Sequence, residues 1–127
     1  MKLLLDTHAL LWWLLDAAEL PASARRAIER AGLVRVSAAS IWEVAIKQRL
    51  GKLPELAIPV AELPELARRS GFVPLPVGER HAAAVTSLPP HHRDPFDHLL
   101  IVQAQIEQLT LVSRGPQFGA YGVALRW

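Results

Sequence analysis

The chain contains no cysteine among its 127 residues, which excludes a disulfide framework and any metal site built on thiolates. Long hydrophobic runs are also missing, because the longest, Ala9 to Leu15, is far shorter than a membrane span. Asp6 interrupts the leucines at the start too early for a secretory signal. The sequence has neither a Gly-rich phosphate loop nor a G-x-S-x-G motif, which argues against nucleotide-cofactor enzymes and serine hydrolases. We therefore expect a cytoplasmic protein without a membrane segment.

The chain also lacks a large excess of charge of either sign. The 14 basic and 12 acidic residues leave a net charge of +2, which permits nucleic-acid binding without arguing for it. Hydrophobic residues make up 51% of the chain, and we find no repeat, no low-complexity tract and no linker. Residues 1–127 are therefore predicted to form a single domain with a sizeable core.

The stretch MKLLLDTH, at the start of the chain, organises the predicted fold. Leu3, Leu4 and Leu5 form an apolar run without alternation, which is typical of a parallel strand buried on both faces. Asp6 closes the run, and the following residues, 7–15, are predicted to form a helix. Asp6 thus lies where open α/β sheets place their ligand crevice, although Asp6 or Thr7 can equally cap the helix.

The rest of the chain alternates between short strands and helices. Further strands are predicted at 33–36, 72–77, 109–112 and 123–125, and the second of these is expected near a sheet edge because it contains two prolines. Helices are predicted at 21–31, 37–50, 66–69, 79–86 and 94–106, and a loop at 54–64. This order predicts an α/β fold of three layers, with helices on both faces of a short parallel sheet.

Three carboxylates, those of Asp6, Glu43 and Asp97, are expected at junctions between a strand and a helix. Asp97 shares a helix face with apolar residues, where an unpaired carboxylate costs several kcal/mol. Glu43 has an alternative role, because Ser40 and Glu43 fit the S-x-x-E capping box; it can also lie one turn inside the helix. Asp94, followed by a proline, fits a helix N-cap.

Junctions of this kind gather along one edge of a parallel sheet, so the carboxylates are expected to meet there and repel one another. A divalent cation removes the repulsion, and oxygen ligands favour Mg²⁺ or Mn²⁺. Such an ion polarises a phosphodiester and activates a bound water. The acids therefore predict metal-dependent phosphodiester hydrolysis.

Four stretches carry a resemblance to a known family: LLLDTHALLWWL, VSAASIWEVAIKQRLGKL, LPPHHRDPFDHLLIVQAQ and LTLVSRGPQFGAYGV. They resemble PIN-domain proteins and, more closely, the VapC toxins of bacterial toxin–antitoxin pairs. The resemblance implies an α/β/α fold and a Mg²⁺- or Mn²⁺-dependent ribonuclease that acts on structured RNA such as tRNA or rRNA. It also implies homodimers and inhibition by a cognate VapB-like antitoxin that inserts near the acidic site.

By position, the resemblance implies that Asp6, Glu43 and Asp97 bind the metal. Asp94 would be a further ligand or the helix cap, and Ser113 matches a small hydroxyl residue that ends the fourth strand. The chain departs from the family at Gly115, where an acid is usual. The missing carboxylate weakens metal binding or removes a second metal.

Two other functions stay open. The chain can be a PIN-like module that binds RNA or antitoxin but has lost catalysis through Gly115. It can also be a phosphatase with Asp6 as nucleophile, a weaker reading because His8 stands where a second Asp is usual.

The remaining aromatic residues and histidines are expected to have structural roles. The spacings of the five histidines fit no H-x-x-x-H metal pattern, so packing or surface roles are expected, with weak RNA contacts for those at 91 and 92. Trp12, Trp13 and Trp42 are expected in the core or at a partner interface.

Overall fold

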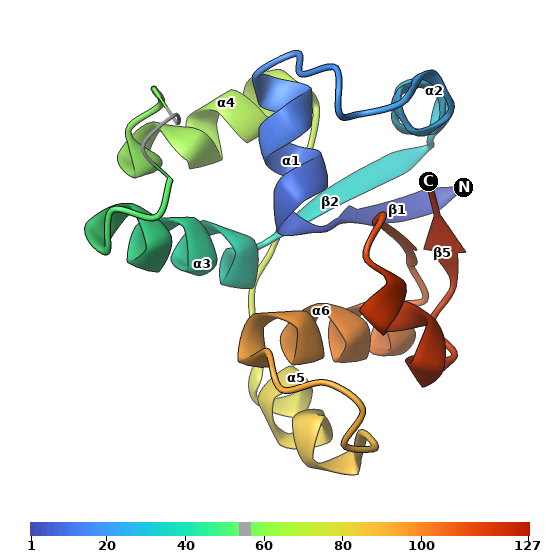
Figure 1. Cartoon of the computed structure of the whole chain (residues 1–127). Helices are drawn as coiled ribbons and strands as arrows, with labels where there is room; N and C mark the ends of the chain where they lie inside the picture. Colours follow the sequence, from blue (N-terminus) through green and yellow to red (C-terminus); the bar gives the residue numbers. More distant parts are fainter. Residues whose placement is uncertain (54–56) are drawn as a thin grey trace.

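The computed structural model describes residues 1–53 and 57–127 and contains a five-stranded, fully parallel sheet. The strands run in the order β3-β2-β1-β4-β5 across the sheet (Figure 1). Their bounds are β1 Lys2–Leu5, β2 Leu33–Ser37, β3 Val73–Leu75, β4 Thr110–Val112 and β5 Leu125–Arg126. The predicted α/β class and central parallel sheet are confirmed, and β3 lies at an edge, as its prolines predicted.

Helices cover both faces of the sheet, with α1, α2 and α4 on one side and α5 and α6 on the other (Figure 1). Helix α3 lies beyond the end of β2 and contacts both α1 and α6. The helices are α1 Thr7–Leu14, α2 Ala22–Arg30, α3 Ala38–Arg49, α4 Leu63–Arg69, α5 Glu79–Ala84 and α6 Pro95–Ile106. Three 3₁₀ turns, η1 Val60–Glu62, η2 Val85–Ser87 and η3 Pro116–Tyr121, complete the described elements.

Strand β1 is buried on both faces, as its unbroken leucine run predicted. Leu3 and Leu5 pack into the cluster under α1 and α2, whereas Leu4 packs with Leu100 and Ile101 of α6 on the opposite face. All three leucines of β1 are 0% exposed. One strand therefore belongs to both halves of the core.

Several predicted boundaries differ from the structure by one to three residues. Helix α4 begins at Leu63 rather than Leu66, because Pro64 is accommodated in its first turn, where no backbone N–H is needed. The fifth strand is Leu125–Arg126 rather than 123–125. The loop predicted at 54–64 is partly replaced by η1, and its residues 54–56 lie outside the described part of the chain.

The register of the sheet positions the candidate site. Leu5 pairs with Val36 on one side and with Val112 on the other. The residues that follow these three paired positions, Asp6, Ser37 and Ser113, therefore lie in one row at the carboxyl edge of the sheet.

None of the helices in the described ranges has the length and hydropathy needed to cross a membrane.

Candidate metal centre and active site

Asp6 caps helix α1 while facing the site. Its Oδ1 accepts a hydrogen bond of 2.7 Å from the backbone N–H of Ala9, so the predicted capping role is confirmed. The nearby Ser113 hydroxyl lowers the pKa of the same carboxyl group and so favours its charged form. A residue that joins the central strand to a capped helix has little freedom to move, which fixes the carboxylate at the sheet edge.

Glu43 is not a capping residue, so the capping-box reading of Ser40 and Glu43 is wrong. The cap of α3 is Ser37, whose Oγ accepts from the N–H of Ala39, and Glu43 therefore lies inside the helix with a buried side chain. Thr7 Oγ1 donates to Glu43 Oε1 at 2.6 Å, and Lys47 Nζ lies 2.6 Å from Oε2. These two contacts hold the carboxylate and supply one positive charge beside it.

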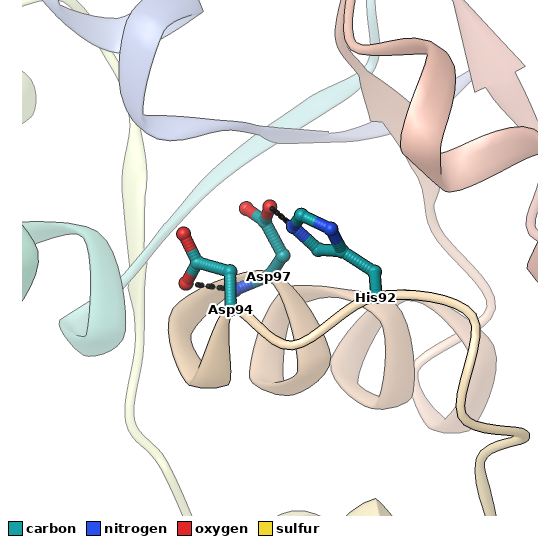
Figure 2. A group of neighbouring side chains, drawn as sticks. All are labelled: His92, Asp94 and Asp97. Atoms are coloured by element: carbon teal, nitrogen blue, oxygen red, sulfur yellow. Dashed lines mark hydrogen bonds and ion pairs between the residues drawn. The ribbon is translucent and has the colours of Figure 1, made fainter.

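Asp94 and Asp97 lie on the first turn of α6 and combine with His92 from the preceding loop (Figure 2). Asp94 is the N-cap, because its Oδ1 accepts from the N–H groups of Phe96 and Asp97. His92 Nε2 lies 2.9 Å from Asp97 Oδ2 and donates to it. One ligand atom from each of His92, Asp94 and Asp97 lies within 4.8 Å of the others, a spacing that can hold a metal ion.

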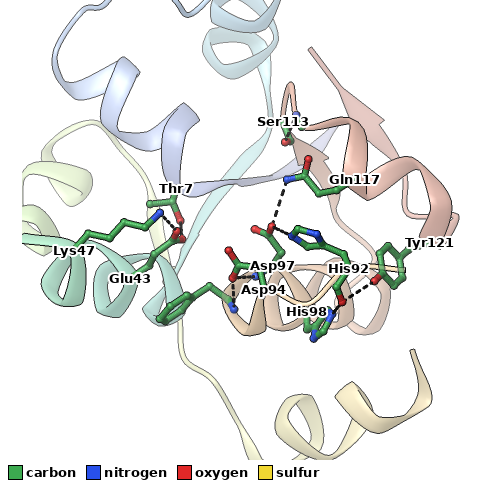
Figure 3. A network of polar contacts seen from close by, with 12 residues as sticks. Thr7, Glu43, Lys47, His92, Asp94, Asp97, His98, Ser113, Gln117 and Tyr121 are labelled. Atoms are coloured by element: carbon green, nitrogen blue, oxygen red, sulfur yellow. Dashed lines mark hydrogen bonds and ion pairs between the residues drawn. The ribbon is translucent and has the colours of Figure 1, made fainter. Parts of the chain in front are cut away.

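All four predicted acids line one cavity of about 250 Å³. The side chains come from α1, α3, α6, η3 and the residues that precede α1 and α6, and Figure 3 shows those from α3, α6 and η3. The lining consists of Asp6, Thr7, His8, Glu43, Lys47, His92, Asp94, Asp97 and Gln117. The acids thus converge as the strand–helix junctions suggested, with Asp94 and Asp97 closest to each other.

Burial makes the charged form of two carboxylates costly. Loss of solvent raises the pKa of Asp6 above its usual range, and the nearby Glu43 raises it further, against the hydrogen bonds from Ser113 and Ala9. The pKa of Asp97 is also raised, first by burial and then by the charge of Asp94. A bound divalent cation would lower both values and remove this cost.

Sequence reasoning did not assign His92 and Gln117 to the site. His92 was expected to have a packing or surface role or a weak RNA contact, because the histidines fit no H-x-x-x-H pattern, whereas the mixed run His92-x-Asp94-x-x-Asp97 brings it to the site. Gln117 carried no signal, because it comes from η3, twenty residues after the Asp97 that it contacts. Three other histidines have packing roles as expected: His81 bonds to Gly78 and Glu107, His91 packs on Tyr121, and His98 bonds to the His92 carbonyl.

The family model of the PIN domain matches residues 3–123. The chain belongs to the PIN-domain family. Ribonuclease VapC16 of Mycobacterium tuberculosis (strain ATCC 25618 / H37Rv) is 46% identical to this PIN domain over 50 residues, which cover 39% of the chain and 36% of VapC16. The match therefore spans about a third of that relative's length.

Three solved structures share the fold of this PIN domain. VapBC2 from Rickettsia felis, bound to a promoter DNA fragment, superposes with a TM-score of 0.68 at 14% identity, covering 99% of this chain and 98% of the other. FitAcB from Neisseria gonorrhoeae gives 0.66 at 21% identity, covering 98% and 96%. FitAB bound to an IR36 DNA fragment gives 0.64 at 21% identity, covering 98% and 94%. These likenesses confirm the predicted PIN-like architecture.

The donor set of the cavity fits a hard divalent cation. Carboxylate oxygens dominate it, and a single imidazole nitrogen is available from His92. Oxygen-rich sites of this kind suit Mg²⁺ and Mn²⁺, and the nitrogen favours Mn²⁺ of the two.

Proposed function

We propose that this PIN domain is a VapC-type endoribonuclease that uses Mg²⁺ or Mn²⁺ to cleave RNA phosphodiester bonds. The observation that carries the proposal is the convergence of Asp6, Glu43, Asp94 and Asp97 on one cavity. Two of the four have a raised pKa, because burial and neighbouring carboxylates disfavour the charged form. A bound cation would favour the charged form again. The match to Ribonuclease VapC16 supports ribonuclease activity.

Each side chain has a role in this proposal. Asp6, Asp94 and Asp97 would hold the ion, and Glu43, fixed by Thr7 and Lys47, would orient a water in its shell. When bound, the ion polarises the phosphodiester and lowers the pKa of that water. Lys47 is also placed to attract the phosphate, since its ammonium group lines the same cavity.

We further propose that a VapB-like antitoxin binds the chain and that two copies form a dimer. Two of the solved structures that share this fold are named VapBC2 and FitAB, and their titles describe them as bound to DNA fragments. Trp42 is 56% exposed and meets the ring of Phe96 edge-on, which leaves an apolar surface suited to a partner. Trp13 is less suited, because its Nε1 donates to Ser70 and its ring packs on Phe72.

The second candidate function is an RNA- or antitoxin-binding module without catalysis. Gly115 favours it, because the loop after β4 contributes no carboxylate to the site. Introducing the acid through Gly115→Asp would switch on cleavage in such a module, whereas an active parent chain needs no such change.

The deciding experiment is cleavage of total RNA and tRNA by purified, antitoxin-free protein with Mg²⁺, Mn²⁺ or EDTA. Asp6→Asn keeps the oxygen that caps α1 and removes a charged ligand, so we expect cleavage to fall by at least about 100-fold. Asp16→Asn is the matched control, since Asp16 is exposed and lies outside the cavity. Retention of RNA without cleavage under any metal would overturn the nuclease and favour the binding module.

A further inference from the structure

Two donors converge on one oxygen of Asp97. Gln117 Nε2 donates to Asp97 Oδ2 at 3.3 Å, and His92 Nε2 reaches the same oxygen at 2.9 Å (Figure 3). Within residues 1–53 and 57–127, no hydrogen bond reaches Oδ1 of this carboxylate. The pair of donors therefore fixes the rotation of the carboxylate and leaves Oδ1 for a ligand.

The side chain of Gln117 reaches this position because residue 115 has no side chain. A Cβ placed on Gly115 would lie 2.5 Å from Gln117 Nε2, 2.6 Å from Oε1 and 2.8 Å from Cδ. The amide thus fills the volume that any other residue at 115 would take. The backbone of Gly115, at φ −62° and ψ 118°, is open to every residue type. Space rather than conformation therefore limits residue 115, because a side chain there would displace the flexible end of Gln117.

Gln117 also separates two cavities. It lines the acidic cavity and a second one of about 250 Å³, which contains the guanidinium of Arg114 stacked 4.8 Å from the ring centroid of Trp12. Asp6 and His8 are shared by both cavities as well. The Gln117 side chain therefore lies at the border between the two cavities.

We propose that Gly115 and Gln117 work as a pair, in which the absent side chain at 115 admits the Gln117 amide as a positioning residue for Asp97. The proposal rests on the proposed function, since it assigns Asp97 as a metal ligand. Groups that orient a metal ligand through a hydrogen bond commonly change metal affinity by about 10- to 100-fold when removed. Gln117 is expected to act at the lower end of that range, because its contact is long and half-exposed.

The test is the affinity for Mn²⁺, measured by the electron paramagnetic resonance signal of the free ion. Gln117→Met keeps the length of the side chain and removes the donor, so we expect binding to weaken about tenfold. Gly115→Ala leaves Gln117 in the sequence but displaces its amide, and it should weaken binding by a similar factor. The double variant should be no weaker than either single one, because both changes remove the same contact.

Gln105→Met is the matched control, since Gln105 is exposed and bonds to the Tyr121 carbonyl away from the site. Melting temperatures of all variants establish that they fold, and if Gln117→Met does not fold, Gly115→Ala gives the same test. Additive losses, or wild-type affinity in Gln117→Met, would overturn the inference and leave the proposed function standing. If the wild-type protein binds no Mn²⁺, or if Asp97→Asn binds Mn²⁺ as tightly as wild type, both the inference and the proposed function would be overturned.

Discussion

At the scale of single residues, the site is built from carboxylates that the fold keeps away from water. Asp6 is 8% exposed and Glu43 is 4% exposed, and the Asp97 side chain retains 14%. Glu43 has the Lys47 ammonium beside it, whereas Asp97 has Asp94 as its charged neighbour on α6. The metal-free protein therefore carries a stability cost concentrated at Asp6 and Asp97.

This cost predicts a pH dependence with a definite sign. Because the pKa values of Asp6 and Asp97 are raised in the folded state, the folded protein binds these protons more tightly than the unfolded chain does. Its stability therefore falls as the pH rises from the ordinary range of Asp through the raised values. In EDTA at pH 7.5, Asp97→Asn should melt a few degrees above wild type, since about 1 kcal/mol shifts a domain of this size by roughly 3–6 °C.

The difference between Asp97→Asn and wild type should shrink toward pH 4, because protonation of Asp97 removes the charge that distinguishes the two proteins. Thermal denaturation monitored by circular dichroism at both pH values measures it. Asp16→Asn, on the surface, should show no such trend. A variant that melts below wild type at pH 7.5 would contradict the assigned cost of the buried charge.

At the scale of elements, helix α6 carries two functions in one residue. Asp94 caps the helix through Phe96 and Asp97, and its carboxylate is also one of the three closely spaced ligand groups. Substitution separates the two roles. Asp94→Ser retains a capping oxygen and should leave the free energy of unfolding within about 0.5 kcal/mol of wild type, whereas Asp94→Ala should lose about 1 kcal/mol.

Both Asp94 variants should bind Mn²⁺ more weakly than wild type, because both lose the carboxylate. Urea denaturation and Mn²⁺ titration on the same preparations measure the two effects. Equal Mn²⁺ affinity in Asp94→Ser and wild type would show that Asp94 is a cap alone.

The elements themselves could be predicted largely from sequence. The unbroken leucines of β1, the apolar spacing of α6 and the Asp94-Pro95 start are local signals, and each corresponds to an observed strand, helix or cap. Glu43 was ambiguous, because the same four letters fit a cap and a helix interior. Its place was settled by Ser37, which caps α3 three residues earlier than Ser40 would.

The contacts around the acids could not be predicted in the same way. Thr7 meets Glu43 across 36 positions of sequence, and Gln117 meets Asp97 across 20. Such pairs depend on how α1, α3, α6 and η3 dock, and no periodicity within one element encodes that docking. Gly115 is an example, because the sequence does not show that the space left by its missing side chain is filled by the Gln117 amide.

At the scale of the whole molecule, β1 contributes side chains to the hydrophobic clusters on both faces of the sheet. Leu4 is completely buried on the α6 side, among Leu100, Ile101 and Leu111. Leu4→Ala should lower the free energy of unfolding by about 3 kcal/mol, because the cavity cannot collapse between a sheet and a helix. Leu50→Ala, at a position 62% exposed, should change it by less than about 0.5 kcal/mol in the same urea titration. Similar losses for both would contradict this account of the core.

The candidate ligands belong to different packed units, because Asp6 follows β1, Glu43 lies in α3, and Asp94 and Asp97 lie at the start of α6. A chain in which α6 has not yet docked holds Asp6 and Glu43 but lacks the ligands at 94 and 97. Under the proposed function, RNA cleavage would therefore require α6 to be docked. A bound ion would then hold these elements together, and amide hydrogen exchange in α3 and α6 should slow together when Mn²⁺ is added.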